Sequence, residues 1–370
     1  MAVGAGDNYW RDNRLPGILK HRIIRRYLPL YLARTSSKDG RAVYIDGYAG
    51  RGFYENGEAG SAGLLMEFAL EAQGEYILRL FEKDKTNYEH LNSAAEKFAA
   101  EGVNVKCERG DVVDKIENTV TEADGLPLFL FLDPCGVGLP FEMVVNAMNR
   151  PAAGEWPPTE LLMNFSWEAI RRIGGHVSSP RGSEKTLERL DTALGGDWWR
   201  EHFLAGTSDE AVEAVVDGFI NRLGAATNCS VASLPVRRKP SHKPIYSLVY
   251  ATRSPRGFWH FADITAKSLE DVRIAHEALA EPGFFSIATP QQDAENAALP
   301  DIEKNILSIL EKRSEFIVGD FPFLVFGEHI GTVGEKIVRK AIKSLHRQGR
   351  TPSTGVGGKT ENLKVVRPKR

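Results

Sequence analysis

The sequence predicts an α/β protein built on a Rossmann-like, doubly wound sheet. Over its first half, strand-like apolar segments alternate with segments that suit helices, which is the pattern of a parallel sheet. Polar residues follow these strand candidates, at the edge where such sheets bind ligands. The run Leu128–Leu132 is apolar without a break, as expected for a strand covered on both faces. The chain has 370 residues, 42% of them hydrophobic, and we expect more than one domain.

The first strand candidate, Ala42–Asp46, ends in a carboxylate and leads into a turn that is dense in glycine. Gly47, Gly50 and Gly52 allow positive φ angles and a close approach of the backbone to a ligand. Their G-x-x-G-x-G spacing differs from the G-x-G-x-x-G of dinucleotide-binding enzymes, and no G-K-[ST] follows to hold phosphates. An acidic residue before such a turn favours a nucleoside with a cationic centre over a polyphosphate. S-adenosylmethionine is a ligand of that kind.

Two further strand candidates also lead to carboxylates. The candidate Tyr76–Glu82 ends in Glu82, which can accept hydrogen bonds from both hydroxyls of a ribose. The candidate Val103–Cys107 is followed by Asp111, which is placed to reach an adenine amino group. Each residue has a structural alternative, Glu82 as a solvated charge and Asp111 as a helix N-cap. The repetition of carboxylates at successive strand ends favours one shared site.

The fourth and fifth strand candidates carry the groups that we expect to face an acceptor. Leu128–Leu132 is followed directly by Asp133 and Pro134, and Glu160–Phe165 carries Asn164 near its end. A late strand is expected from Ile245 to Ala251.

This series resembles the class I S-adenosylmethionine-dependent methyltransferases and, more narrowly, the three-Cys-motif partner protein family, TcmP. The likeness covers about residues 15 to 350 and is carried by Tyr44–Gly52 with Gly60-Ser61, Phe81-Glu82, Gly110-Asp111, Phe131–Gly136, Met163–Phe165 and Lys243–Thr252. The resemblance implies a methyltransferase fold with S-adenosylmethionine as the cofactor. Its methionine part would lie at Asp46, Gly50 and Gly52, its ribose at Glu82 and its adenine at Asp111. The family's name also implies association with a three-Cys-motif, radical-type iron–sulfur protein.

The full set of expected cofactor-binding residues is Asp46, Tyr48, Ala49, Gly50, Gly52, Glu82, Lys83, Asp111, Val112 and Asp133. The expected catalytic residues are Asp133, Pro134 and Asn164. Asp133 would accept hydrogen bonds from an amine and align its lone pair for in-line attack on the donor methyl group, with Asn164 orienting the acceptor. Amino-methyltransferases that act on adenine carry an Asp/Asn-Pro-Pro-aromatic turn at this place. This chain lacks the second proline and the aromatic residue.

Cys135 leaves a second mechanism open. The Pro134-Cys135 pair resembles the nucleophile motif of pyrimidine C5-methyltransferases, in which a thiolate adds to C6 of the base and activates C5. That reaction requires a lowered thiol pKa and a nearby carboxylate. The alternative is a small buried cysteine without a chemical role. The family commonly has an aromatic residue at this position.

Two segments around the predicted sheet are expected to be helical. Residues 171–240 form an insert, with helices over 183–194 and 208–223, that can cap the pocket. Trp198 and Trp199 in this insert either stack on a base or anchor the packing. The segment 15–31 has an apolar stripe at helical spacing. Lys20, Arg22, Arg25 and Arg26 lie between its members, and the arginines are expected on the solvated side.

The last part of the chain is strongly basic. Residues 335–370 contain eleven Lys or Arg and two acids, a formal charge of +9. Since the net charge of the whole chain is −2, the first 334 residues carry a formal charge of −11. Helices over 301–310 and 334–345, a glycine-rich segment at 355–358 and an extended segment at 363–366 are typical of a winged helix. Five cations of the second helix would face a nucleic-acid backbone: Lys336, Arg339, Lys340, Lys343 and Arg347. Protein docking or simple solvation of these side chains is the alternative.

We therefore expect a Rossmann-like methyltransferase-type domain over residues 1–295 and a basic, winged-helix-like domain over 296–370. No apolar run of about 18 residues suggests a membrane span, and the first residues show no signal-peptide pattern. Cys107, Cys135 and Cys229 lack metal-ligand spacing, which favours reduced thiols and a cytoplasmic location. The histidines show no metal-binding pair, so no metal site is expected.

The leading functional hypothesis is S-adenosylmethionine-dependent methylation of nucleic acid or of a nucleobase-containing molecule. One alternative is a small-molecule or peptide methyltransferase. The other is a catalytically inactive partner or nucleic-acid-binding subunit of a three-Cys-motif iron–sulfur protein.

Overall fold

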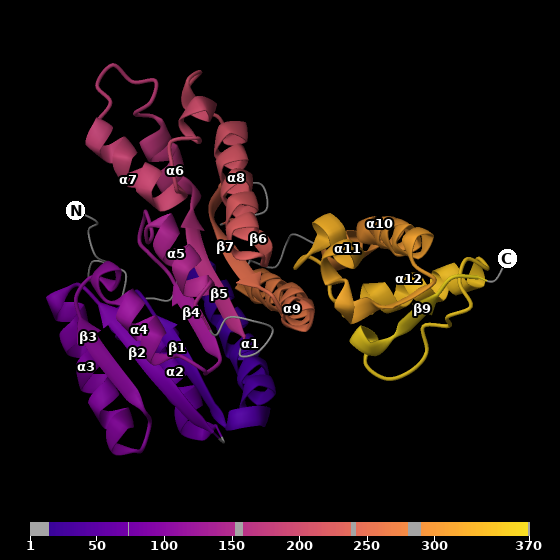
Figure 1. Cartoon of the computed structure of the whole chain (residues 1–370), viewed down its shortest axis with the longest axis horizontal. Helices are drawn as coiled ribbons and strands as arrows, with labels where there is room; N and C mark the ends of the chain where they lie inside the picture. The colour runs from indigo at the N-terminus through magenta and orange to yellow at the C-terminus, as the bar shows by residue number, and fades with distance from the viewer. Residues whose placement is uncertain (1–14, 73, 152–157, 238–241, 280–289, 369–370) are drawn as a thin grey trace. The chain divides into compact units, whose positions relative to one another are not determined.

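The computed structural model describes residues 15–72, 74–151, 158–237, 242–279 and 290–368 (Figure 1). The chain divides into two units, Met1–Arg253 and Ser254–Arg370. The boundary expected after residue 295 instead lies inside a helix of the second unit, α10 (Pro290–Lys312). The division falls earlier because α9 (Pro255–Leu279) supplies Trp259 and Ala262 to the core of the second unit.

Within the described residues, seven strands of the first unit form one sheet in the order β3-β2-β1-β4-β5-β7-β6. The strands are β1 (Arg41–Asp46), β2 (Glu75–Glu82), β3 (Val105–Arg109), β4 (Leu128–Leu132), β5 (Thr159–Ser166), β6 (Ser230–Arg237) and β7 (Pro244–Thr252). Strands β1 to β5 pair in parallel, and β7 runs antiparallel to both β5 and β6. The chain leaves β1 toward β3 and returns to β4 on the other side of β1, so the sheet is Rossmann-like with its switch point between β1 and β4.

Most of the expected strands are confirmed, with two differences. The third strand, β3, begins at Val105, two residues later than the sequence pattern indicated. The insert is not helical throughout, because its last part forms the strand β6. Ala232, Leu234 and Val236 of β6 are buried at every second position, which is the alternation of a strand with one covered face.

The helices of the first unit connect and cover these strands. They are α1 (Leu15–Asp39), α2 (Ser61–Glu71), α3 (Lys85–Ala100), η2 (Val112–Asp114), α4 (Ile116–Glu122), α5 (Phe141–Met148), α6 (Trp167–Gly174), α7 (Glu184–Leu194), η3 (Arg200–Phe203) and α8 (Asp209–Thr227). The predicted helices α1, α7 and α8 are all present.

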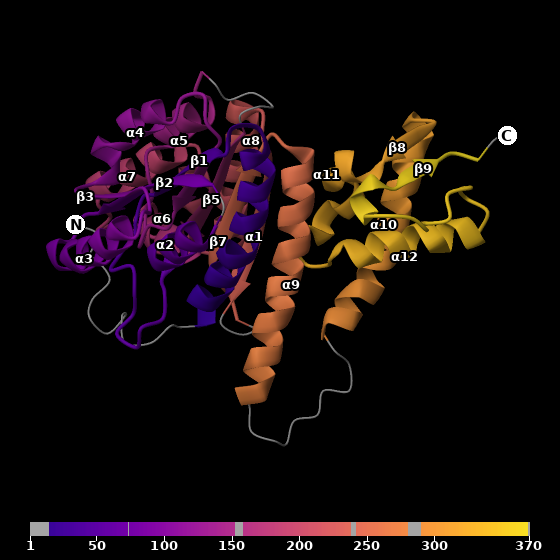
Figure 2. The ribbon, with the colours of Figure 1, turned by 90° about the horizontal axis from the view of Figure 1, so that it is seen from below.

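Both faces of the central strand β4 are covered, which explains its unbroken apolar run. Leu128, Leu130 and Leu132 belong to a core that they share with residues of α4 to α8. On the opposite face α1 lies along the sheet (Figure 2), and the Tyr31 ring meets Phe129 edge-on with 5.3 Å between ring centroids. All five residues of β4 are buried.

The second unit is built from helices and a short two-stranded sheet. Besides α9 and α10 it contains β8 (Glu315–Ile317), η4 (Val318–Asp320), α11 (Pro322–Phe326), η5 (Gly327–His329), α12 (Glu335–Arg347), η6 (Thr360–Asn362) and β9 (Lys364–Val366). β8 and β9 pair antiparallel. The apolar face expected on α12 is buried: Ile337, Val338, Ala341, Ile342 and Leu345. The helices, the glycine-rich segment and the last strand follow one another in the order that the sequence predicts. The winged-helix assignment stays a prediction.

None of the helices that the structure describes combines the length and the apolar character needed to cross a lipid bilayer.

Candidate functional site

Asp46 at the end of β1 organises the glycine-dense turn. The Tyr48 amide donates to its Oδ1 at 3.0 Å, and the Ser61 hydroxyl at the start of α2 donates to its Oδ2 at 2.8 Å. The side chain is fully buried, and this burial raises the pKa of Asp46 to about 7, although both hydrogen bonds favour the carboxylate. The structure therefore places Asp46 behind the turn, where it holds the loop in shape.

The four amides of the turn at residues 47–50 all donate to acceptors inside the protein. Gly47 donates to the Phe131 carbonyl at 3.0 Å and Ala49 to the Phe81 carbonyl at 2.9 Å. Tyr48 donates to Asp46, and Gly50 donates to Oε2 of Glu82 at 2.9 Å. A loop that binds phosphate needs amides that point at the ligand. This stretch has none to offer, because the neighbouring strand ends already use them.

The turn is also closely packed. Gly50 and Gly52 have φ angles of 63° and 80°, in the left-handed region that favours glycine. The Gly60 amide donates to the Gly52 carbonyl at 2.8 Å. A Cβ on Gly63, in the first turn of α2, would lie 2.4 Å from that same carbonyl oxygen. The backbone of α2 thus presses directly on the turn.

Glu82 joins the end of β2 to this turn. Besides the Gly50 amide, it accepts a hydrogen bond from the Asp84 amide to Oε1 at 2.7 Å. Partial burial raises the pKa of Glu82, while these amides counteract the shift. The side chain is half-buried, so its carboxylate combines a fixed orientation with remaining exposure.

Asp111 caps η2, as the structural alternative predicted. Its Oδ1 accepts the Val113 amide at 3.2 Å, and its Oδ2 pairs with the Lys83 ammonium at 2.7 Å. Burial opposes ionisation, but the hydrogen bonds from Lys83 and Val113 outweigh it and lower the pKa of Asp111. Val112 beside it is buried, and a Cβ on Gly47 would lie 3.2 Å from its Cγ2. Contact of Asp111 with adenine stays a prediction.

The end of β4 differs from the sequence-based expectation, because Lys20 of α1 forms an ion pair with Asp133. Lys20 is 5% exposed and is therefore not on the solvated side of α1. Asn164 of β5 donates from Nδ2 to Oδ1 of Asp133 at 2.8 Å. Burial opposes ionisation of Asp133, yet the Lys20 charge outweighs it and holds the pKa below its ordinary value. Each carboxylate oxygen of Asp133 thus has a fixed donor.

A signal for Lys20 was present in the helical periodicity. Positions 20, 24, 27 and 31 share one face of a helix, and Ile24, Tyr27 and Tyr31 are all buried. A lysine on that face must either pair its buried ammonium with a carboxylate or extend its side chain so that the ammonium reaches solvent. The sequence alone did not identify Asp133 as the partner.

Cys135 is exposed, so the alternative of a small buried cysteine is wrong. Although the residue is exposed, its thiol is partly shielded from water, and this desolvation and the neighbouring Asp133 carboxylate raise the pKa of the thiol. A nucleophilic cysteine needs the opposite shift. The structure therefore does not favour the thiolate mechanism. Pro134 lies in the turn itself, and a Cβ on Gly138 would be 3.3 Å from its Cγ.

The paired tryptophans of the insert serve the packing. Trp199 is fully buried and donates from Nε1 to Oδ1 of Asp191 at 2.9 Å. Trp198 donates to the Leu194 carbonyl at 3.0 Å, and the Arg222 guanidinium lies 5.2 Å from its ring centroid. Stacking of Trp199 on a base is excluded by its burial.

Two hollows lie near the site. A small one of about 20 Å³ is lined by Asn164, by residues 136–139 and by residues of α6 and α7. A larger one of about 480 Å³ lies beside the glycine-dense turn and is lined by Arg51, Phe53, Tyr54, Glu55, His90, Ser93, Ala94, Lys97 and Phe98.

In the second unit, four of the five predicted nucleic-acid-binding cations are exposed: Lys336, Lys340, Lys343 and Arg347. Arg339 is half-buried and has a different role. Its guanidinium donates to the carbonyls of Gly355 at 3.0 Å and Gly358 at 2.6 Å. It therefore holds the glycine-rich segment against α12.

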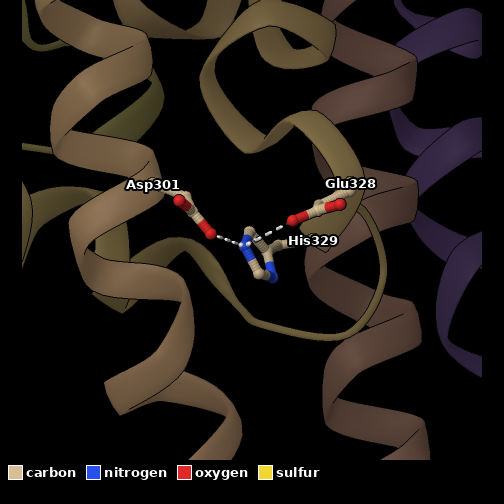
Figure 3. Close-up of side chains that lie close together, drawn as sticks. All are labelled: Asp301, Glu328 and His329. Atoms are coloured by element: carbon tan, nitrogen blue, oxygen red, sulfur yellow. Dashed lines mark hydrogen bonds and ion pairs between the residues drawn. The ribbon is translucent and has the colours of Figure 1, made fainter.

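His329, Asp301 and Glu328 form the one group of three adjacent metal-ligand side chains among the described residues (Figure 3). Nε2 of His329 lies 2.9 Å from Oδ2 of Asp301 and 3.8 Å from Oε1 of Glu328. The sequence pattern did not predict this group, because Asp301 comes from α10 and the other two from η5. The His329 ring contacts both carboxylates, which are largely exposed. We assign them to holding η5 against α10.

No family model matches the chain, and no curated protein is similar to it. Solved structures with some similarity include S-adenosylmethionine-dependent methyltransferases at low identity. The small RNA methyltransferase HEN1 is 10% identical over 63% of this chain and 25% of that one, with a TM-score of 0.35. Precorrin-6y C5,15-methyltransferase from Geobacter metallireducens GS-15 is 16% identical over 60% and 85%, with a TM-score of 0.29. TYW2 from M. jannaschii, solved in complex with AdoMet, is 12% identical over 62% and 75%, with a TM-score of 0.29. At these TM-scores the matches assign no residue role and no reaction to this chain.

Proposed function

We propose that the first unit binds S-adenosylmethionine and uses it as a methyl donor. The observation that carries this proposal is the combination of a glycine-dense turn whose amides at residues 47–50 all donate inside the protein and a series of carboxylates at the adjoining strand ends. Such a site suits a ligand that is a nucleoside, carries positive charge and lacks phosphate. NAD and ATP both carry phosphate groups and a net negative charge, whereas S-adenosylmethionine is a nucleoside with a sulfonium cation and no phosphate.

The residues at the strand ends have the properties that this cofactor requires. Glu82 is oriented by two amides and half-exposed, so its remaining lone pairs can accept ribose hydroxyls. Asp111 and Val112 follow the next strand, β3, where an adenine would lie, and Lys83, directly after β2, pairs with Asp111. The backbone of Tyr48 to Gly52 would border the methionine part, with Asp46 supporting it from behind. When bound, the cofactor supplies an electrophilic methyl group, and the residues Asp133, Pro134 and Asn164 would face the acceptor.

We propose nucleic acid or a nucleobase-containing molecule as the acceptor. The exposed cations of α12 support it, since lysines and arginines along one helix face are the usual contacts to a phosphate backbone. The resemblance of the last domain to a winged helix supports the same class.

Two alternatives make different predictions. A small-molecule or peptide methyltransferase would bind the cofactor but show no affinity for nucleic acid. A catalytically inactive partner of a three-Cys-motif iron–sulfur protein, as the TcmP resemblance implies, would transfer no methyl group to any acceptor and would bind that partner. The intact series of Asp46, Glu82 and Asp111 argues against a lost cofactor site.

Calorimetric titration of the full chain tests the cofactor proposal. We expect micromolar binding of S-adenosylmethionine and S-adenosylhomocysteine and no binding of NAD or ATP. Glu82→Gln should weaken binding at least tenfold, while Glu101→Gln, at an exposed carboxylate after α3, should leave it unchanged. Equal binding of ATP, or no effect of Glu82→Gln, would sink the assignment of this pocket.

A further inference from the structure

We propose that the larger hollow, between the glycine-dense turn and α3, binds single-stranded nucleic acid. Its cations would contact the phosphates and its aromatic rings would contact the bases. This inference rests on the proposed function, because it gives the nucleic-acid acceptor a binding site on the first unit. Single-stranded DNA and RNA share the chemistry that the hollow recognises.

The hollow has the size of a ligand site. Its volume is about 480 Å³. Pockets that bind small molecules usually measure roughly 300–1,000 Å³. The hollow beside Asn164 measures only about 20 Å³, which is room for a single water molecule. Of these two hollows, the larger one alone can take a nucleotide.

One face of α3 forms a wall of this hollow. His90, Ala94 and Lys97 follow one another at spacings of four and three residues, and Ser93 and Phe98 adjoin them. From residue 90 to residue 98 the helix rises by about 12 Å. One strand of a nucleic-acid duplex advances by about 3.4 Å per nucleotide, so this wall can follow more than one nucleotide. A free nucleotide covers only part of the wall, so micromolar binding of ATP is still not expected.

The second wall comes from the glycine-dense turn and the residues after it. Phe53 pairs with Ala59 in an isolated antiparallel bridge, which closes the segment into a loop. Arg51, inside the turn, donates from Nε to Oδ1 of Asn87 at 2.8 Å, and this hydrogen bond orients its guanidinium. The fold therefore holds both walls in place without a ligand.

The charges of the lining favour an anion. Arg51 and Lys97 are cations, and the imidazole of His90 adds a third when it is protonated. Glu55 is the one acid among the lining residues. With His90 neutral the lining has a formal charge of +1, although the first 334 residues together carry −11. Lysine and arginine are the usual contacts to the phosphates of nucleic acids.

The aromatic side chains supply faces on which bases can stack. The rings of Phe53 and Phe98 are nearly parallel, with 6.2 Å between their centroids and 8° between their planes. Both residues are half-buried and both line the hollow, so part of each remains accessible. A charged groove with aromatic rings binds single strands of any sequence, because every base has a flat face. A duplex keeps its bases stacked on one another and cannot use these rings.

Fluorescence polarisation of the full chain tests the inference with two labelled oligonucleotides of about ten nucleotides, oligo-dT and oligo-U. We expect at least one of them to bind. Phe98→Leu keeps an apolar side chain but removes the flat ring, so affinity should fall about fivefold or more. Phe68→Leu is the matched control, since Phe68 is half-buried in α2 and does not line the hollow. It should leave the affinity unchanged.

Lys97→Gln tests the charge of the hollow without disturbing its packing, because this lysine is exposed. The slope of log affinity against log salt should decrease by about 0.7. Lys85→Gln, the same change at an exposed lysine of α3 outside the hollow, should leave the slope unchanged. Failure of both oligonucleotides to bind would overturn the inference. Wild-type binding by both Lys97→Gln and Phe98→Leu would do the same, since the oligonucleotide would then bind elsewhere on the chain.

Titration of each variant with S-adenosylhomocysteine is the control for folding. Both hollow variants should bind this ligand as tightly as the wild type. A wild-type chain that binds S-adenosylhomocysteine but neither oligonucleotide rejects this inference and leaves the cofactor site standing. Absence of cofactor binding rejects the proposed function instead.

Discussion

The phenol of Tyr27 donates a hydrogen bond of 2.7 Å to Oε2 of Glu160 and so joins α1 to the beginning of β5. The Tyr250 hydroxyl of β7 lies 2.6 Å from that of Tyr27, and the Thr252 hydroxyl donates to Oε1 of Glu160 at 3.1 Å. Glu160 is only 2% exposed, and this burial raises its pKa to about 7. The group lies at the opposite end of β5 from Asn164. We therefore assign it to the stability of the first unit.

Glu160 makes the stability of the protein depend on pH. The pKa of a glutamate in an unfolded chain is about 4.3, so the folded state binds the proton more tightly than the unfolded state between there and about 7. The contribution of Glu160 is fully present below pH 4.3 and is lost as the pH rises through 7. Its loss lowers the free energy of unfolding by about 4 kcal/mol. Glu160→Gln should remove this part of the pH dependence.

Urea unfolding at pH 5 and pH 8 checks this prediction. We expect the wild-type chain to lose stability relative to Glu160→Gln as the pH rises. Comparison with the variant is needed because His21, whose pKa burial lowers to about 3, acts in the opposite direction as the pH falls below 6.5. Glu101→Gln serves as the exposed control. Parallel pH profiles for the wild type and Glu160→Gln would contradict the assignment.

The features that could be predicted from the sequence are local ones. The turn at 47–52, the apolar run of β4 and the buried face of α12 each lie within one short segment, so periodicity and glycine spacing reveal them. The partners of Lys20 and Glu160 could not be predicted, because 113 and 133 residues separate the paired groups. The sequence pattern does not reveal strand β6, because this strand directly follows the long helix α8 in a segment predicted to be a helical insert.

Because α2 packs closely on the glycine-dense turn, one methyl group added at Gly63 should lower both the stability of the protein and its affinity for the cofactor. In Gly63→Ala the new Cβ would lie 2.4 Å from the Gly52 carbonyl oxygen, which must then move. We expect an unfolding free energy lower by about 1–3 kcal/mol. Because the turn borders the proposed cofactor site, affinity for S-adenosylmethionine should also fall at least tenfold in calorimetric titration.

Gly358→Ala is the matched control, since nothing lies within 4 Å of a Cβ at that position. This substitution should leave the free energy of unfolding and the affinity for S-adenosylmethionine unchanged. A Gly63→Ala protein with wild-type stability and cofactor affinity would show that the turn adapts freely.

The thiol of Cys135 should react more slowly than an exposed cysteine with an ordinary pKa. Its pKa is raised by partial burial and by Asp133, so the thiolate is scarce at neutral pH. The reaction of Cys135 with a disulfide reagent is followed as a function of pH in a chain with Cys107→Ser and Cys229→Ser. We expect the pH at which the rate is half-maximal to be higher in the folded chain than in the unfolded chain. Cys135→Ser should bind S-adenosylmethionine as tightly as the wild type and retain methyl transfer. Loss of transfer with intact cofactor binding would restore the thiolate mechanism.

Neighbouring cations of α12 should differ in what they stabilise. Lys340→Ala removes an exposed charge, so affinity for a 20-base-pair duplex should fall and the slope of log affinity against log salt should decrease by about 1. Arg339→Ala releases the carbonyls of Gly355 and Gly358, which should lower the free energy of unfolding by about 2 kcal/mol. Fluorescence polarisation at several salt concentrations and urea unfolding measure the two effects. If Lys340→Ala leaves the salt slope unchanged, the exposed face of α12 does not contact the phosphate backbone, and the docking alternative for this unit gains support.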